Sequence, residues 1–193
     1  MDKFRYSALA LAVGSLCGAP AAQATCNSVG NLVPDCGFGS GIGSWSNTDA
    51  IGNPFSVVAY NAGEGHDAPG SVQSGNPTTL QSAASLCLAG NIPSGLLEAR
   101  LWARENGGAG ASCTTNLLRF DNPACVSPNS GGATSGTYSN TSTWQPRASG
   151  AVDVTGAQSL KVLVTCQASE SFTGFVDDVV LAVPGYMFSD SFE

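Results

Sequence analysis

The residues best suited to chemistry lie on one short stretch, LLEARLWAR (96–104). Apolar and polar residues alternate along it, which favours a β-strand although the residues also have good helix propensity. One face of that strand carries Glu98, Arg100, Trp102 and Arg104. Sugar sites pair an aromatic ring, which packs on the apolar side of a pyranose, with planar polar groups that bond its hydroxyls. We therefore expect this face to bind carbohydrate.

Two more residues would join this face if their strands lie alongside, namely Tyr60 in FSVVAY (55–60) and Gln145 in WQPRASGAVDV (144–154). A purely structural role is the alternative. In that case Trp102 plugs one end of the fold, and the arginines extend into solvent or pair with acids such as Asp121.

Two adjacent acids, Asp177 and Asp178, interrupt the apolar strand pattern FTGFVDDVVL (172–181). Side chains alternate across a strand, so we expect one of them to point toward the apolar face. A buried carboxylate must be paired, hydrogen-bonded or metal-bound. Acids on opposite faces cannot form the facing pair that a glycosidase needs.

The only histidine, His66, lies in the turn-rich stretch GEGHDAPGS (63–71), next to Asp67. No G-x-S-x-G motif accompanies it, and adjacent residues rarely orient one another as members of a catalytic triad do. We expect a solvated loop histidine and a protein that is not an enzyme.

The elements that must position these residues are strands. Short apolar stretches without a convincing helix are separated by segments rich in Gly, Ser, Asn and Pro, chiefly 61–71, 105–112 and 122–136. This pattern predicts an all-β antiparallel sandwich, or jelly roll. The stretches are 55–60, 79–88, 96–104, 115–121, 144–154, 159–166 and 175–183.

The chain begins with a predicted signal peptide, residues 1–24: Lys3 and Arg5, an apolar run, and the small-x-small ending Ala22-Gln23-Ala24. Residues 25–183 suit one domain, and 184–193 (PGYMFSDSFE) form an aromatic, acidic tail. No later apolar run reaches the roughly 20 residues that span a bilayer. We expect a secreted, periplasmic or cell-surface protein.

The net negative charge of the chain argues against two classes of binding partner. The chain has 7 Lys and Arg against 14 Asp and Glu, a formal net charge of −7. Nucleic acids and anionic membranes both reward clustered basic residues, so we expect neither as a partner.

Six cysteines remain after the signal peptide, and an even number in an exported chain predicts disulfides that staple the fold. Short separations predict Cys26–Cys36 and Cys113–Cys125, which leaves Cys87–Cys166 as a long-range link. A zinc site is the alternative, but the chain lacks a C-x-x-C pair and a second histidine.

Three stretches together resemble carbohydrate-binding-module-like jelly rolls of the galactose-binding-domain-like group: NLVPDCGFGSGIGSWS (31–46), WQPRASGAVDVTGAQSLKVLVTC (144–166) and FTGFVDDVVL (172–181). The resemblance covers nearly the whole of residues 25–193 and marks fold more than ligand. It implies that Trp45 and Trp144 are core or fold-marking aromatics.

The resemblance also implies a structural calcium ion, because in this group the closing strand lies beside the first strand and an acid from each helps to hold the metal. Asp177 or Asp178 would be one ligand, and Asp35 another. The sequence departs from the pattern at Gly39, where the group has a glutamate after Phe38. In the alternative, one aspartate accepts backbone amides of the first strand and the other is solvated.

These observations favour an exported, non-catalytic binding protein whose partner is a polysaccharide or glycan. The alternative from another class is a structural or adhesion scaffold of the cell surface, without a small-ligand site and with the tail as its attachment signal.

Overall fold

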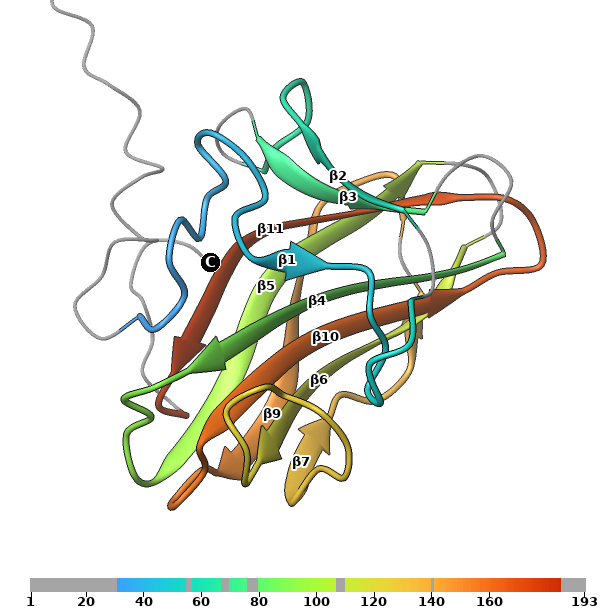
Figure 1. The fold of residues 1–193 in the computed structure, drawn as a ribbon. Coiled ribbons are helices and arrows are strands. Elements are labelled where there is room, and N and C mark those ends of the chain that lie inside the picture. The colour runs from blue at the N-terminus through green and yellow to red at the C-terminus, as the bar shows by residue number, and fades with distance from the viewer. Residues whose placement is uncertain are drawn as a thin grey trace, which may run out of the picture.

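The computed structural model describes residues 31–54, 57–66, 70–75, 80–106, 110–139 and 141–184. They form two antiparallel sheets packed face to face, as the two layers of Figure 1 show. The described residues contain no helix, and hence none that is long and apolar enough to cross a membrane. The predicted β-sandwich is confirmed.

The six-stranded sheet has the order β1-β4-β10-β6-β7, with β8 paired to β6. Its central strands β4, β10 and β6 pair in register over nine residues each. The strands are β1 (Trp45–Ser46), β4 (Gln81–Ala89), β6 (Ser112–Phe120), β7 (Gly131–Thr134), β8 (Tyr138–Ser139) and β10 (Ser159–Gln167).

The five-stranded sheet has the order β2-β3-β11-β5-β9. Its strands are β2 (Val58–Asn61), β3 (Ser71–Ser74), β5 (Leu96–Asn106), β9 (Gln145–Asp153) and β11 (Thr173–Ala182). Beyond its pairing with β3, strand β11 also contacts the segment 31–36. The Val179 N–H donates to the Cys36 carbonyl, and the Asn31 side chain forms hydrogen bonds with the backbone of Val179 and Leu181. The opening segment therefore lies beside the closing strand, as the resemblance implies.

The core lies between the sheets and follows the alternation read from the sequence. Leu97, Ala99, Leu101 and Ala103 of β5 are buried, while the residues between them are half-buried on the outer face. Burying a leucine side chain stabilises the fold by roughly 1.5–3 kcal/mol, so this alternation fixes which face of β5 points outward.

The predicted pairing Cys113–Cys125 is wrong, because Cys113 bonds Cys166. The two are directly opposite each other on β6 and β10, with their Cα atoms 4.1 Å apart. Register across the sheet, which sequence separation does not report, brings these two cysteines together.

The predicted pairing Cys87–Cys166 is wrong for a related reason. Residues 121–130 fold back over the outer face of the six-stranded sheet, where Cys125 meets Cys87 of β4. Cys36 is also disulfide-bonded. Its predicted partner Cys26 lies outside the described residues, as do the predicted leader and residues 185–193 of the tail.

A second, smaller apolar cluster lies beneath the segments 121–130 and 47–54 on that outer face. It contains Ala83, Leu118, Phe120, Cys125 and Leu163. Lys161 is buried beside it, and its Nζ donates to the Asp49 carbonyl oxygen at 3.0 Å. Burial lowers the pKa of Lys161, although the nearby Asp49 charge opposes the shift.

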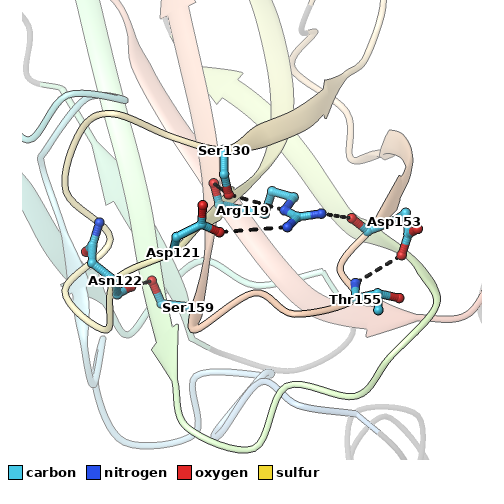
Figure 2. A network of polar contacts seen from close by, with 7 residues as sticks. All are labelled: Arg119, Asp121, Asn122, Ser130, Asp153, Thr155 and Ser159. Atoms are coloured by element: carbon cyan, nitrogen blue, oxygen red, sulfur yellow. Dashed lines mark hydrogen bonds and ion pairs between the residues drawn. The ribbon is translucent and has the colours of Figure 1, made fainter.

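Arg119 ties one end of the sandwich together, as Figure 2 shows. Its guanidinium donates to Ser130 Oγ at 3.2 Å and to the Asp153 carbonyl at 3.0 Å, and it lies 3.7 Å from Asp121. Since Asp153 ends β9, these contacts join the two sheets.

Candidate functional site

The predicted polar face of β5 exists. Glu98, Arg100, Trp102 and Arg104 all lie half-buried on the outer side of the five-stranded sheet. The strands on either side are β11 and β9.

The other two residues predicted for this face are not brought to it. Tyr60 pairs with the buried Val72 and packs against the core. Gln145 pairs with Ala103, which is fully buried. Directly opposed residues point to the same side of a sheet, so both turn away from Trp102.

His66 lies directly over the indole of Trp102. The two rings are stacked with centroids 3.7 Å apart and planes at 14°. Nδ1 lies 2.9 Å from Asp178 Oδ2, and because a carboxylate only accepts, Nδ1 is the donor. The expectation of a solvated loop histidine is wrong, because only 15% of the side chain is exposed.

The aspartate pair owes its geometry to a β-bulge. The register of β11 against β5 shifts between Asp177 and Val180, and Asp178 has φ of 47°. Both carboxylates consequently reach His66, so the expectation of opposite faces is wrong. A bulge re-aims side chains in this way.

Asp177 is buried, and its carboxylate accepts two backbone amides. The His66 N–H donates to Oδ2 at 2.7 Å, and the Asp178 N–H donates to Oδ1 at 2.8 Å. Hydrogen bonds therefore stabilise this buried acid, as the alternative to calcium expects. The donating amides belong to His66 and Asp178, however, and not to the first strand. Asp178 contacts His66 and is not simply solvated.

The predicted metal ligands do not gather into one site. Asp35 is exposed and accepts the Gly39 amide at 3.2 Å in its own turn. Among the described residues, no group of three or more His, Cys, Asp or Glu side chains is arranged to hold a metal. Calcium bound by Asp177, Asp178 and Asp35 stays a prediction that this arrangement does not support.

Arg104 also lies on this face of β5, where it contacts aromatic rings. Its guanidinium lies over the rings of Trp144 and Phe175, 5.5 and 4.7 Å from their centroids, and pairs with Glu64. Trp144 also meets the edge of His66, so the expectation of a core or fold-marking role does not describe its surroundings. Trp45, by contrast, is buried in the core against Phe38.

We call Trp102, His66, Trp144, Arg104 and Asp178 the aromatic cluster. The charged side chains of this cluster contact groups within the protein, and one face of the Trp102 ring is covered. The interactions hold β5, β11 and the segment before β9 together.

A hollow of about 270 Å³ opens on the same face of the sheet, between β5 and β9. We call it the β5–β9 hollow. Its lining is Glu98, Arg100, Pro146, Arg147 and Ala148. Arg100 forms an ion pair with Glu98.

A larger groove of about 350 Å³ crosses the outer face of the other sheet. We call it the polar groove. Its lining is Gln81, Ser112, Thr114, Thr137, Thr165, Cys166 and Gln167. In the register, Gln81, Gln167 and Ser112 form one row across β4, β10 and β6, and Thr165 lies opposite Thr114 in the next row.

The lining of the polar groove offers hydroxyl and amide groups without a charged side chain. Thr114 and Thr165 share a hydrogen bond of 2.9 Å, and the Cys113–Cys166 disulfide joins the same two strands beneath. Glutamine amides both donate and accept, as sugar hydroxyls do. The groove can therefore form several neutral hydrogen bonds with a ligand rich in hydroxyls.

Sequence reasoning missed the groove because none of its residues carries distinctive chemistry. One signal was present: polar residues take alternate positions at the ends of strands whose other positions are apolar, as in SLKVLVTCQ (159–167). Nothing in the sequence shows that three such ends lie side by side.

No protein-family model and no curated protein sequence matches the chain. Solved structures do resemble it. TmCBM61, solved with β-1,4-galactotriose, has a TM-score of 0.55 at 13% identity, covering 79% of this chain and 98% of that one. The CBM22-1 xylan-binding domain of Paenibacillus barcinonensis Xyn10C has a TM-score of 0.55 at 16% identity, covering 75% and 89%.

A third similar structure belongs to an enzyme. The CBM22-1 and GH10 modules of Clostridium thermocellum xylanase 10B, solved with xylohexaose, give a TM-score of 0.58 at 14% identity, covering 81% of this chain and 29% of that one. At such identities the likeness concerns the fold. The chain therefore has a β-sandwich fold similar to that of these carbohydrate-binding modules.

Proposed function

We propose that the protein is exported and binds carbohydrate without chemically changing it, and that the polar groove is its principal site. The observation that carries the proposal is the row of exposed Gln81, Gln167 and Ser112 across three neighbouring strands. The fold supports it, because the solved relatives named above include modules that bind xylan or β-1,4-galactotriose.

The polar groove is a better site than the aromatic cluster predicted from the sequence. A sugar that stacked on Trp102 from the side of His66 would have to displace that histidine and break its bond to Asp178. A ligand in the groove meets exposed amides and hydroxyls that ordinary water already solvates, so it exchanges one set of hydrogen bonds for another.

The groove lining supports the non-catalytic part of the proposal. Glycoside hydrolysis uses a pair of carboxyl groups across the scissile bond, and the residues that line the groove include neither Asp nor Glu. Export is supported by the predicted leader and by the disulfides, which persist in oxidising compartments.

The scaffold alternative keeps one observation in its favour, the covered Trp102 ring. Under that alternative both outer faces serve stability or adhesion, and no soluble glycan binds.

Titration calorimetry with soluble xylan and β-1,4-galactan tests the proposal. Gln81→Ala and Gln167→Ala should each weaken binding about threefold to tenfold, because a neutral hydrogen bond contributes roughly 0.5–1.5 kcal/mol. Gln158→Ala is the matched control, since Gln158 is an exposed glutamine just before the other end of β10. An affinity that is unchanged in both groove variants would exclude the polar groove as the site. A wild-type protein that binds no glycan would favour the scaffold alternative.

A further inference from the structure

We propose that the polar groove binds an extended, neutral polysaccharide chain that runs across the strands, with one sugar unit over each of β4, β10, β6 and β8. The groove selects chains in which both linking bonds of each sugar are equatorial. The kind of ligand rests on the proposed function, whereas the direction of the chain, its subsites and its conformation are argued from the residues of the groove.

The first row of the groove crosses four strands. Directly opposed residues point to the same side of a sheet. Gln81, Gln167 and Ser112 are opposed to one another in the register, and Ser139 of β8 lies opposite Ser112. Because β4, β10 and β6 lie side by side and β8 pairs with β6, this row offers one polar side chain on each of the four strands (Figure 1).

The second row lies two residues further along each strand. Thr165 is opposite Thr114, and Thr137, which directly precedes β8, lines the groove with them. On β4 this row is closed, because its member Ala83 is fully buried in the smaller apolar cluster. Strands β10 and β6 and the start of β8 therefore each offer two polar side chains to a ligand, and β4 offers only Gln81.

The direction of the bound chain follows from what covers the sheet beyond these rows. The next outward residue of β10 after Thr165 is Leu163, which is buried beneath the segments 47–54 and 121–130. Two rows lie about 7 Å apart at 3.2–3.4 Å per residue, so a ligand laid along one strand has room for about one sugar unit. Several units fit only when the chain runs across the strands.

The spacing of the strands suits an extended chain. Neighbouring strands lie about 4.7–4.9 Å apart. This spacing is close to the length that one pyranose adds to a chain with equatorial bonds on both sides of each link, as in xylan and β-1,4-glucans. Chains with one axial bond at each link, such as α-1,4-glucans and β-1,4-galactan, curve away from such a row. The groove therefore favours chains of the xylan type.

The first row is available to a ligand. Gln81, Gln167, Ser112 and Ser139 are all exposed. Within the described part of the chain, their side chains are hydrogen-bonded to no other group. Amides and hydroxyls both donate and accept, as sugar hydroxyls do. Each strand can therefore form at least one hydrogen bond with the sugar unit above it.

The second row is held in place by the sheet itself. The Asn116 side-chain amide donates to Thr114 Oγ1 at 3.2 Å and to the Leu163 carbonyl at 3.3 Å. Thr114 and Thr165 share a further hydrogen bond of 2.9 Å. Groups that are already ordered lose little conformational entropy on binding, which favours affinity.

The electrostatics of the groove favour a neutral chain. The lining includes no charged side chain, and the protein has a formal net charge of −7. An acidic polysaccharide would find no cation in the lining and would be repelled by the protein as a whole.

The test is titration calorimetry with β-1,4-linked xylo-oligosaccharides of two to six units. Affinity should rise with each unit up to four, by about threefold to tenfold per unit, the effect of one neutral hydrogen bond. Beyond four units it should level off, because the first row ends. Malto-oligosaccharides and β-1,4-galacto-oligosaccharides of four units should bind at least tenfold more weakly than the xylo-oligosaccharide of that length.

The two glutamines form a matched pair of variants. Gln81→Ala should reduce the affinity for four units to that for three and leave the affinity for three unchanged, because β4 holds only the outermost unit. Gln167→Ala should weaken both about threefold to tenfold, because either placement of three units covers β10. Thermal melts check that each variant is folded.

Ser139 tests the extension of the row to β8. Ser139→Ala should weaken binding of four units at least threefold. Ser94→Ala, in the exposed turn between β4 and β5, is the control and should have no effect.

Two results overturn the proposed chain geometry and leave the proposed function standing, provided that Gln167→Ala still weakens binding. One is an affinity that does not depend on length between two and four units. The other is equal affinity for the malto- or galacto-oligosaccharides. A wild-type protein that binds no glycan overturns both the geometry and the function.

Discussion

The two outer faces of the sandwich use opposite kinds of residues. The five-stranded sheet carries aromatic and charged side chains, and in the aromatic cluster these contact one another. The polar groove on the six-stranded sheet is lined by small hydroxyls and two glutamines, several of them exposed.

The side chains that could interact most strongly with a ligand are therefore not the ones that are exposed to it. Trp102, His66 and Asp178 form the contacts that would also be strongest with a ligand, yet the fold uses those contacts to hold β5 and β11 together. Gln81 and Gln167 interact more weakly, but their exposure leaves them available to a partner in solution.

The two disulfides give the largest expected effect. By the chain-entropy relation, removing either link, with separations of 38 or 53 residues, should lower the free energy of unfolding by about 4 kcal/mol. Cys113→Ala with Cys166→Ala should also weaken glycan binding, because that link lies beneath the groove. Cys87→Ala with Cys125→Ala should leave affinity unchanged. Urea unfolding and calorimetry measure both, and equal loss of affinity in the two pairs would contradict the placement of the site.

Substitution of Asp177 should come next. Asp177→Ala leaves two amides, those of His66 and Asp178, without their buried acceptor, and should lower the free energy of unfolding by about 3 kcal/mol. Asp177→Asn retains one acceptor oxygen and should cost less. Urea unfolding provides the test, and a loss below about 1 kcal/mol for Asp177→Ala would show that the bulge is held by other contacts.

His66→Ala should have a smaller effect. The loss of the stacked ring and of the bond to Asp178 should lower the free energy of unfolding by about 1–2 kcal/mol, with affinity in the groove unchanged. Calorimetry measures whether the glycan affinity of this variant is unchanged, as expected if the ligand binds on the six-stranded sheet. A large loss of glycan affinity in this variant would place the principal site on the aromatic cluster instead.

The smallest effect concerns pH. Burial lowers the pKa of Lys161 in the folded protein below its unfolded value of 10.5, so the fold disfavours its charged form. The unfolded chain then binds more protons, and stability rises as pH increases from the folded pKa toward 10.5. Lys161→Met should remove that rise in urea unfolding followed from pH 7 to 10. Burial also raises the pKa of Tyr138, which opposes the trend only above pH 10, its ordinary value.

The alternation of apolar and polar residues along the sequence predicts most of the strands of the fold. The alternation of 96–104 predicts the strand, its buried side and its outer side, because a side-chain period of two is a property of the strand itself. Long-range facts were harder. Cys113 meets Cys166 through register across two strands 53 residues apart, which sequence separation does not encode.

The candidate site shows the same division. The half-buried row on β5 follows from alternation, but the bulge at Asp178 breaks that alternation and His66 arrives from a turn more than a hundred residues earlier. The polar groove depends on three strand ends that only the sheet order brings together. Its residues are ordinary in type, so their position alone gives them a role.

Glycan binding in the polar groove is tested most directly by an NMR titration of isotope-labelled protein with a soluble xylo- or galacto-oligosaccharide. If glycan binds in the polar groove, the side-chain amides of Gln81 and Gln167 and the backbone amides around Thr165 and Ser112 should shift first, while the Trp102 indole signal stays in place. Shifts centred on Trp102 and His66 with the groove unmoved, or no shifts with any oligosaccharide, would contradict it.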